Sequence, residues 1–386
     1  MSKADKTGRV LSPKVRAWLT DPLPADVRRA VDRLARADDV RQVALMPDVH
    51  LAGEVCIGTV LATDRLVYPQ AVGSDIGCGM TAVAFRCPAG VVRSEAAARR
   101  VLAALPECVP VKRHRSLTSA PPLPATLRHT SLTAGPLVSA AKHEGSIELG
   151  TLGRGNHFLE FQADEDDRLW LMVHSGSRAM GQRITQWHMR HALRVAGGLC
   201  TLDTDTPEGQ AYLTDATWAV DYAEANRRAM AMAIAHLLQE HLGVRMAWDT
   251  LFSICHNHVR RESHRGSVFW VHRKGANAAA EAEPGIIPGA MGRASVHVTG
   301  RGCKAALCSS SHGAGRILTR QEARQQISLR SLLAEVEDVW FDETVAAGLR
   351  EEAPSAYRDL AAVLRVQNAL VRIIRRLTPI LCYKGA

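Results

Sequence analysis

Segments typical of strands and segments typical of helices follow one another irregularly, and this mixture most constrains what the chain can fold into. A doubly wound parallel sheet needs regular βαβ units, and no such alternation runs through the sequence. No solenoid repeat and no clear linker divides the 386 residues, which are enough to bury a substantial core. We therefore expect one α+β domain over residues 1–386, with mixed sheets flanked by helices.

Hydrophobic periodicity locates the expected elements. Helices are expected over 24–38, 92–104, 178–195, 207–241 and, from apolar residues at helical spacing, 354–377. Apolar runs predict strands in "RQVALMPDV", which should stop at Pro47, and in "IGTVLATD", "MTAVAFRCP", "RLWLMVHSGSR", "SVFWVHRKGA" and "RASVHVTG". Residues 109–144 are rich in Pro, Ser, Thr and basic side chains, which predicts a long mobile loop that acts as a lid or faces RNA.

Charge and cysteine content narrow the class of protein. The net charge is +9, from 48 Lys and Arg against 39 Asp and Glu, which favours a nucleic-acid or phosphorylated partner. No apolar run of about 18 residues predicts a membrane span, and the polar opening stretch predicts no export signal. Nine irregularly spaced cysteines do not indicate a disulfide framework, so we expect a cytoplasmic protein.

The stretch "AVGSDIGCGM", residues 71–80, places Asp75 and Cys78 in a turn with three glycines. Glycines allow the backbone to fold tightly and bring the carboxylate and the thiol to one point. Those two groups suit a divalent metal, and a thiolate can bridge two ions. The alternative is a glycine turn that merely contains a buried free cysteine, and this stretch alone favours that alternative.

Histidines in three other loops supply further candidate ligands. "LGTLGRGNHFLEF" contains Asn156, His157 and Glu160; "VHSGSR" contains His174; and "ICHNHVRRE" contains His256 and His258. A single histidine is more often a hydrogen-bonded core or surface residue. Three such loops together with an Asp-x-x-Cys turn favour a metal centre, with zinc or manganese as the best match to the ligand types. Five ligands with Cys78 shared would serve two ions, an arrangement that suits phosphoryl or nucleotidyl transfer.

Four loops combine Gly or Ser with a nearby cation: "HSGSR", "RKGA", "IIPGAMGRAS" and "SSSHGAGR". Backbone N–H groups in such turns bind anions, although any one of them could be a plain turn. His312 lies in the last of these loops. A histidine in a phosphate-binding loop can attack phosphorus and form a phosphoramidate, whereas its alternative role is a hydrogen-bonding residue at a helix start.

Ten motifs in sequence resemble those of the RtcB-type RNA ligases. They are "MPDVH", "VGSDIGCGM", "LGTLGRGNHFLE", "VHSGSR", "CHNHV", "RKGA", "IPGAMGRAS", "SSHGAGR", "PSAYRD" and a terminal "KG", and they span most of the chain. Each motif is short, but ten in the same order are highly specific. The resemblance implies a compact RtcB-like domain with a central cleft for metal and nucleotide.

The resemblance also assigns roles to matching positions. It implies two manganese ions held by Asp75, Cys78, His157, His174 and His256, with Cys78 bridging them. It makes His312 the residue that takes GMP from GTP. It implies nucleotide contacts for Asn156, Glu160, Ser295, Ala314, Gly315, Arg316, Tyr357 and Lys384, of which Glu160 and Lys384 read the guanine and Tyr357 stacks on it. Arg178, Lys274 and Arg320 match cations that hold RNA phosphates.

The implied reaction joins RNA ends bearing a 3′-phosphate or a 2′,3′-cyclic phosphate to 5′-hydroxyl ends. A cyclic end is first opened, His312 becomes guanylylated, GMP moves to the RNA 3′-phosphate, and the 5′-hydroxyl then displaces GMP. Expected partners are therefore RNA and GTP, in RNA repair or tRNA splicing.

The chain departs from the family pattern at two places. Ala52, Gly53 and Glu54 follow "MPDVH" where the family usually has a stretch with lysine between glycines, and Ala290 stands where a small hydroxyl residue is frequent. These departures indicate a divergent branch, with repair of cleaved tRNA or ribosomal RNA as the hypothesis. A metal-dependent phosphodiesterase that only opens cyclic phosphates, and an RNA-binding protein without activity, are the alternatives. The phosphodiesterase has no use for His312, Tyr357 and Lys384, and the RNA-binding protein would leave the full set of candidate metal ligands unexplained.

Overall fold

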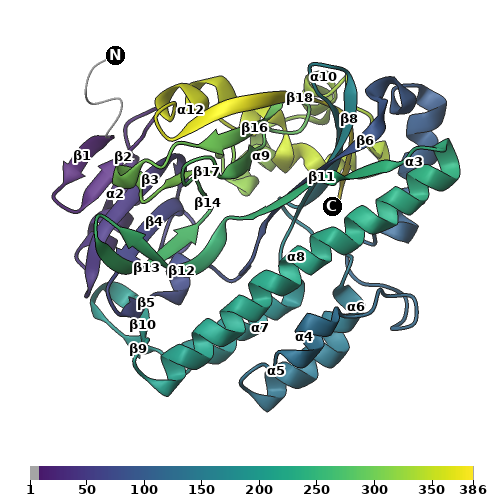
Figure 1. The fold of residues 1–386 in the computed structure, drawn as a ribbon. Coiled ribbons are helices and arrows are strands. Elements are labelled where there is room, and N and C mark those ends of the chain that lie inside the picture. The colour runs from purple at the N-terminus through teal and green to yellow at the C-terminus, as the bar shows by residue number, and fades with distance from the viewer. Residues whose placement is uncertain (1–7, 386) are drawn as a thin grey trace.

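Two large sheets organise the protein, for which a computed structural model describes residues 8–385 (Figure 1). The six-stranded sheet has the order β1 (Arg9–Ser12), β2 (Val15–Ala17), β3 (Val40–His50), β4 (Ile57–Thr63), β13 (Ser267–Lys274), β12 (Asn257–His264). The seven-stranded sheet has the order β11 (Met246–Cys255), β6 (Gly79–Pro88), β8 (Arg168–Ser175), β7 (Phe158–Ala163), β18 (Val371–Lys384), β16 (Ser295–Gly300), β15 (Pro284–Ile287). Only β2 and β3 pair in parallel within these two sheets, which confirms the expected α+β class.

Smaller elements complete the framework. Two short sheets contain β5 (Leu66–Val67), β10 (Cys200–Asp203) and β9 (Leu193–Arg194), and β14 (Ala276–Ala278) with β17 (Ser309–Ser311). The helices are α2 (Ala25–Ala35), α3 (Glu95–Cys108), α4 (Ala125–His129), α5 (Gly135–Ala140), α6 (Ser146–Glu148), α7 (Arg178–Met189), α8 (Pro207–Leu242), α9 (Arg320–Gln326), α10 (Leu329–Glu335), α11 (Ala346–Leu349) and α12 (Leu360–Val366). In the part of the chain that the structure describes, no helix combines the length and apolarity needed to cross a membrane.

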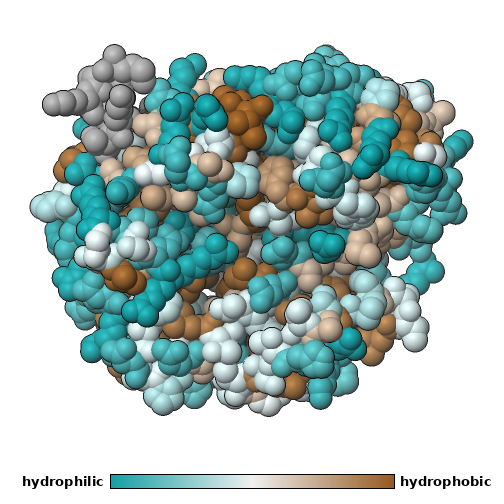
Figure 2. Space-filling model, viewed as in Figure 1, coloured by the Kyte–Doolittle hydropathy of each residue, from teal (hydrophilic) through white to brown (hydrophobic). Residues whose placement is uncertain are grey.

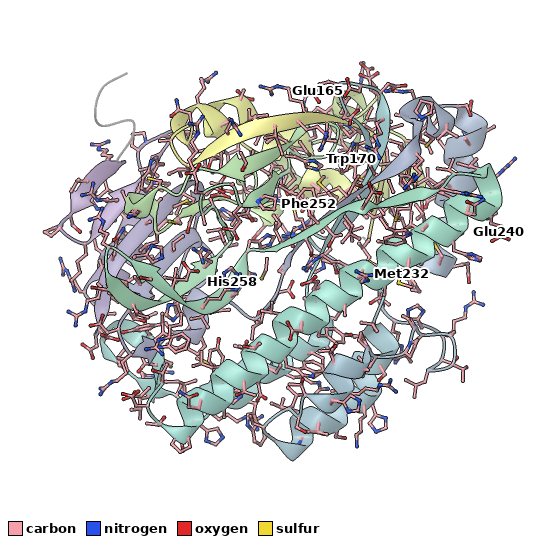
Figure 3. The ribbon with its side chains drawn as sticks, in the orientation of Figure 1. Glu165, Trp170, Met232, Glu240, Phe252 and His258 are labelled. Carbon is pink, nitrogen blue, oxygen red and sulfur yellow. The ribbon has the colours of Figure 1, made fainter. Side chains whose placement is uncertain are left out.

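Helix α8 crosses the whole molecule and packs on the seven-stranded sheet (Figure 1). The Thr206 side chain caps its first turn by accepting from the Gly209 N–H, Pro207 begins it, and Gly243 ends it with a left-handed φ of +66°. Ile234 and Leu238 of α8 join Phe161 in a fully buried apolar cluster. Each such side chain contributes roughly 1.5–3 kcal/mol by leaving water. The outer face of α8 carries the exposed Met232 and Glu240 (Figure 3).

The visible face in Figure 2 is mostly hydrophilic, with small hydrophobic groups between polar ones. Such scattered apolar exposure is ordinary for a folded protein in water.

Three expected elements differ from the structure. Strand β3 does not stop at Pro47 but continues to His50. The helix expected over 178–195 ends at Met189. Residues 109–144 are not one irregular loop, because they contain α4 and α5 and place Leu127 and Leu137 in the core.

The C-terminal segment is the largest correction. Helical spacing predicted one helix over 354–377, but α12 ends at Val366 and Val371 begins the strand β18. From Val371 to Arg376 exposed residues alternate with less exposed ones, which is the period of a strand. β18 pairs with both β7 and β16, so hydrogen bonding on two sides overrides the helical pattern of this arginine-rich segment.

Candidate active site

The candidate metal ligands lie at one end of four adjacent strands of the seven-stranded sheet, β11, β6, β8 and β7. Cys255 is opposite Gly79, and Phe158 is opposite His174, across antiparallel pairs in which one strand starts where its neighbour ends. The candidate ligands at this end of the strands are Asp75 and Cys78 before β6, His157 before β7, His174 in β8 and His256 after β11.

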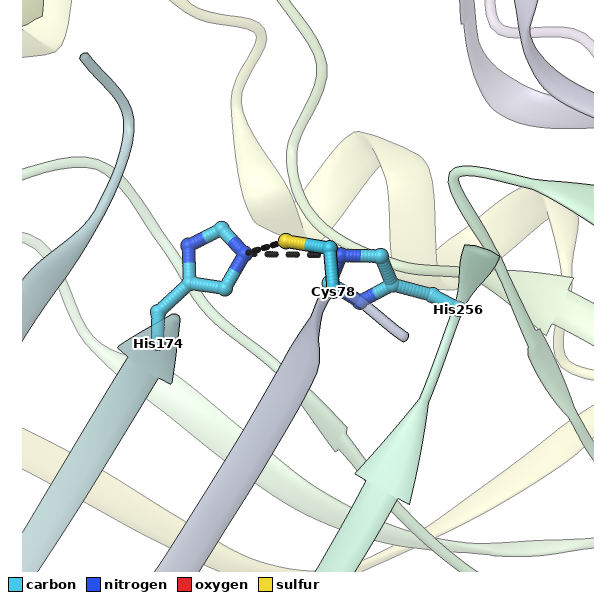
Figure 4. Close-up of side chains that lie close together, drawn as sticks. All are labelled: Cys78, His174 and His256. Atoms are coloured by element: carbon cyan, nitrogen blue, oxygen red, sulfur yellow. Dashed lines mark hydrogen bonds between the residues drawn. The ribbon is translucent and has the colours of Figure 1, made fainter. Parts of the chain in front are cut away.

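The donor atoms of these residues converge. Cys78 Sγ lies 3.5 Å from His157 Nε2 and 3.3 Å from His174 Nε2. His157 Nε2 lies 3.0 Å from Asp75 Oδ2, and His174 Nε2 lies 3.4 Å from His256 Nε2 (Figure 4 draws Cys78 with the last two histidines). The donors form two groups that share Cys78, one with His174 and His256 and one with Asp75 and His157. Because a thiolate can bridge, this donor set fits a pair of divalent cations.

Hydrogen bonds from Nδ1 of two imidazoles leave their Nε2 atoms free to bind a cation. His157 Nδ1 lies 3.0 Å from the Leu152 carbonyl oxygen, and His174 Nδ1 lies 3.0 Å from the Asn156 carbonyl oxygen. A ring that donates from Nδ1 keeps its lone pair on Nε2, as metal-binding histidines commonly do. His256 differs, because its buried Nδ1 has no hydrogen-bond partner among the described residues.

Burial sets the charge of the cluster in the absence of a cation. It raises the pKa of the Cys78 thiol well above its usual range, and the neighbouring Asp75 raises it further. It also lowers the pKa of His174 and His256 well below the ordinary value. Burial opposes ionisation of Asp75 as well, but its hydrogen bond with His157 outweighs this effect and lowers its pKa. These directions favour a protonated Cys78 thiol and neutral His174 and His256 rings at neutral pH.

We expect the affinity for divalent cations to rise about tenfold for each pH unit between pH 6 and 8, because the raised pKa of Cys78 means that a bound cation must displace its proton. Calorimetric titrations with Mn²⁺ at several pH values, repeated in buffers of different ionisation enthalpy, would measure both the affinity and the proton released. An affinity independent of pH would contradict ligation by the thiolate.

A buried arginine on α8 secures the Asp75–Cys78 turn. Arg227 Nη1 donates to the carbonyl oxygens of Gly77 and Ser175, each at 3.0 Å. Gly77 adopts a φ of +81°, and a Cβ on it would lie 2.8 Å from the Cβ of Ala223. The glycine therefore allows the turn to lie directly on α8, where Arg227 reaches its backbone.

Asp48, for which the sequence motifs predicted no role, positions His312. Its Oδ2 accepts from His312 Nδ1 at 2.6 Å and from the backbone N–H groups of His312 and Gly313 at 3.1 and 3.3 Å. Protonation of Nδ1 leaves the lone pair on Nε2, which is the state needed for nucleophilic attack. The His312 ring centroid lies 4.9 Å from that of His256. The loop of His312 can lie directly on Asp48 because residue 315 is a glycine, with φ +77°. A Cβ on Gly315 would lie 2.7 Å from Asp48 Cα.

Glu352 gathers three of the residues expected to contact nucleotide. Its Oε2 lies 2.9 Å from Lys384 Nζ and accepts from the Tyr357 hydroxyl at 2.7 Å. Its Oε1 accepts from Arg316 Nη1 at 3.2 Å, and the Arg316 guanidinium lies 4.8 Å from the centroid of the Tyr357 ring. Burial opposes ionisation of Glu352, but the charge of Lys384 and these hydrogen bonds lower its pKa. The sequence offered no signal for this carboxylate beyond its place before "PSAYRD".

Glu160 stands on β7, close to this group. Burial raises its pKa to about 8, although a 2.6 Å hydrogen bond from Gln162 Nε2 and the charge of Lys384 act in the opposite direction. A ligand that presents N–H donors to Glu160 would stabilise its ionised form.

One cleft of about 730 Å³ brings most of the predicted residues together. Among its lining residues are Asp75, Cys78, Asn156, Glu160, His174, His256, Lys274, His312, Ala314, Gly315, Arg316, Arg320, Tyr357 and Lys384. Lys274 Nζ donates to the Ala52 and Val55 carbonyl oxygens at 2.9 and 2.7 Å. Ala290 lines the cleft with only 9% of its surface exposed, while Glu54 faces solvent.

Ser295 and Arg178, like the candidate ligand His157, lie outside the lining of this cleft. The Ser295 hydroxyl is buried and accepts from the Gly289 N–H at 3.2 Å, so it supports the loop behind the cleft wall. Arg178 begins α7 and donates to the Thr151 hydroxyl and the Val111 carbonyl oxygen. Their predicted contacts with nucleotide and RNA remain predictions.

Clustered thiol, carboxylate and imidazole donors next to an activated histidine are typical of metal-dependent enzymes. Comparison with known proteins then gives the family. The family described as tRNA-splicing ligase RtcB matches residues 30–129 and 125–385. The RNA-splicing ligase RtcB of Escherichia coli is 33% identical over 400 residues, covering 96% of this chain and 97% of its own. The chain belongs to the RtcB family of RNA ligases.

More distant relatives agree. The RNA-splicing ligase RtcB of Mycobacterium tuberculosis is 30% identical, with 90% of this chain and 97% of its own covered. The tRNA-splicing ligase RtcB of Aeropyrum pernix is 28% identical, with 63% of this chain and 61% of its own covered. The expected family, and with it an RNA ligase, is confirmed.

Proposed function

We propose that this chain uses GTP to join RNA ends bearing a 3′-phosphate or a 2′,3′-cyclic phosphate to 5′-hydroxyl ends, through a covalent His312–GMP intermediate, in RNA repair or tRNA splicing. The observation that carries the proposal is the pairing of His312 with Asp48 in the same cleft as the metal-type donors and the Glu160–Lys384 region. A phosphodiesterase would need the donors but not a histidine held for attack on phosphorus.

The residues divide the work as follows. His312 Nε2 attacks the α-phosphorus of GTP, pyrophosphate leaves, and Asp48 stabilises the positive ring. Glu160 and Lys384 read the guanine edge, while Arg316 and Tyr357 flank the guanylate. Two manganese ions, held by Asp75, Cys78, His157, His174 and His256, would neutralise the phosphate oxygens when bound.

The second half of the reaction uses the same cleft. An RNA 3′-phosphate displaces His312 from GMP, and the RNA end becomes an activated diester of pyrophosphate type. The 5′-hydroxyl of the other RNA then attacks that phosphate, and GMP leaves. Lys274 and Arg320, which line the cleft, would hold RNA phosphates, and Arg178 would do so at its margin.

Incubation of the full chain with GTP labelled at the α-phosphate and Mn²⁺ tests the proposal. We expect an acid-labile label on His312, located by mass spectrometry, and release of pyrophosphate. Absence of label with continued opening of cyclic phosphate ends would instead indicate a phosphodiesterase. Absence of both label and metal binding would indicate an RNA-binding protein without activity.

Asp48→Asn is expected to lower the rate of GMP transfer to the protein by about 10²–10⁴-fold, because an amide can present the wrong group to Nδ1 and cannot stabilise a charged ring. The rate of label incorporation in a single turnover would measure the effect, and the bound metal content should stay unchanged. A variant that labels at the normal rate would show that Asp48 does not position the nucleophile.

A further inference from the structure

A second hollow of the protein lies on the outer face of α2. It has a volume of about 450 Å³, and its lining residues are Arg29, Asp32, Arg33, Arg36, Ala37 and Gly197. Positions 29, 33 and 36 follow helical spacing, so these three arginines stand on one face of α2, opposite its buried residues. No residue to which the proposed reaction assigns a role lines this hollow.

The positive charge of this hollow is not neutralised by acids of its lining. Asp32, the acid in the lining, lies 3.4 Å from the Nε atom of Arg28, which is outside the lining. In the part of the chain that the structure describes, none of Arg29, Arg33 and Arg36 forms an ion pair. Arg33 Nε is also buried, and no described residue accepts its hydrogen bond. Because buried donors are rarely left unbonded, an oxyanion that accepts from several N–H groups matches this hollow.

A short loop connects the hollow to the cleft. Arg33, which lines the hollow, donates from Nη2 to the Glu54 carbonyl oxygen at 3.1 Å. Lys274, which lines the cleft, donates from Nζ to the carbonyl oxygen of the next residue, Val55, at 2.7 Å, and to that of Ala52 at 2.9 Å. Consecutive Cα atoms are about 3.8 Å apart, so the two cations border the same short loop. A strand of RNA that passes Lys274 in the cleft can therefore reach the arginines of α2 next.

Gly197 brings a second loop onto α2 at this hollow. Its φ is +83°, a backbone conformation that favours glycine, and a Cβ there would lie 2.6 Å from Arg33 Cγ. The glycine therefore lets the loop pack on the aliphatic stem of Arg33. This contact and the hydrogen bond to Glu54 hold the guanidinium in place without using its charge.

We propose that this hollow on α2 binds backbone phosphates of the RNA where the RNA leaves the cleft. The inference rests on the proposed function, because it needs RNA as the substrate of the cleft. Phosphate oxygens match guanidinium donors in pairs, which suits a row of arginines. Val27 of α2 lines the cleft, and Arg36 lies nine residues further along, or roughly 13 Å at the rise of a helix. A stacked strand spaces its phosphates about 3.4 Å apart, so this path takes roughly four nucleotides.

Binding of RNA to the full chain tests the proposal, measured by fluorescence anisotropy at several salt concentrations without GTP. The RNAs carry a 5′-hydroxyl and a 3′-phosphate and are either about 12 or about three nucleotides long, so that only the longer one can reach from the cleft to the hollow. Arg29→Gln combined with Arg36→Gln removes two exposed cations of the hollow. We expect the affinity for the longer RNA to fall at least about fivefold and the slope of log affinity against log salt to weaken by about 1.4, since each phosphate contact of a single strand contributes about 0.7. The affinity for the trinucleotide should stay within about twofold of that of the natural chain.

Arg99→Gln combined with Arg100→Gln is the matched control. It removes two exposed arginines from α3, which lies at the opposite side of the molecule from α2 (Figure 1). It should leave the salt slope for the longer RNA close to that of the natural chain. Equal RNA affinity and equal salt slope in the two double variants would overturn the proposal, and this includes the case in which the hollow takes only free phosphate.

Cross-linking to the natural chain decides the question should the α2 variant unfold. The longer RNA, with 4-thiouridine spread along it, should attach on irradiation to peptides of α2 or of the loop that contains Gly197. Cross-links confined to other surfaces would overturn the proposal. Both measurements proceed without GTP, whereas the His312–GMP route is tested by labelling with GTP. A chain that takes the label but binds RNA equally in both double variants would lose only this site, and a chain that takes no label would lose only the proposed route.

Discussion

Replacing His312 with alanine is expected to eliminate the covalent GMP adduct and to lower RNA joining at least about 10⁴-fold, because no other histidine is held for attack in the proposed reaction. The Asp48 carboxylate accepts from Nδ1 of this ring. Among the described residues, no other imidazole forms a hydrogen bond with that carboxylate, and His50 contacts only the Asp48 backbone oxygen. Label from α-phosphate GTP and ligated RNA product are the two measurements.

Two controls make the result specific. His297→Ala removes another buried ring, one that packs against Trp170 and lies outside the cleft lining, and it should label normally if the protein remains folded. The His312→Ala protein should still bind metal and open cyclic phosphate ends, because its metal-type donors are intact. Normal ligation by His312→Ala would refute the covalent route.

The candidate metal ligands, which the structure places close together, were easier to recognise in the sequence than the order of the strands. Asp75, Cys78 and the three histidines lie far apart in the chain, yet each is next to a glycine turn or a strand end, and adjacent strands collect them. The local chemistry of a turn is visible in the sequence. Which strands become neighbours is not, so the meeting of these turns was inferred only from the number of such loops and from the resemblance to a family.

The residues that were missed share a physical reason. Asp48 and Glu352 are buried carboxylates, and Arg227 is a buried guanidinium. Each acts through partners more than 30 positions away or through backbone oxygens, and short-range patterns do not report such contacts. Residues 371–377, the first half of β18, were predicted as helix for the same reason, because the pairing of β18 with β7 and β16 is nonlocal.

Cys78→Ala should have the second largest effect, because Cys78 is the donor that both groups of ligands share. Removing it takes one ligand from each cation position at once, so we expect metal affinity to fall by at least about 10²-fold and ligation to become undetectable. Cys78→Ser should behave alike, since a hydroxyl does not ionise near neutral pH. Titration with Co²⁺ would follow the thiolate-to-metal absorption band, which both variants should lack.

Cys200→Ala is the matched control for this loss, because it removes another buried thiol, on β10, that lies outside the cleft. It should keep the absorption band and the metal stoichiometry. If Cys78→Ala bound two ions with unchanged affinity, Asp75 and the histidines would have to form the site without sulfur. The short contacts of Cys78 Sγ with His157 and His174 argue against that outcome. Donor atoms that converge in this way are placed to bind the same cation.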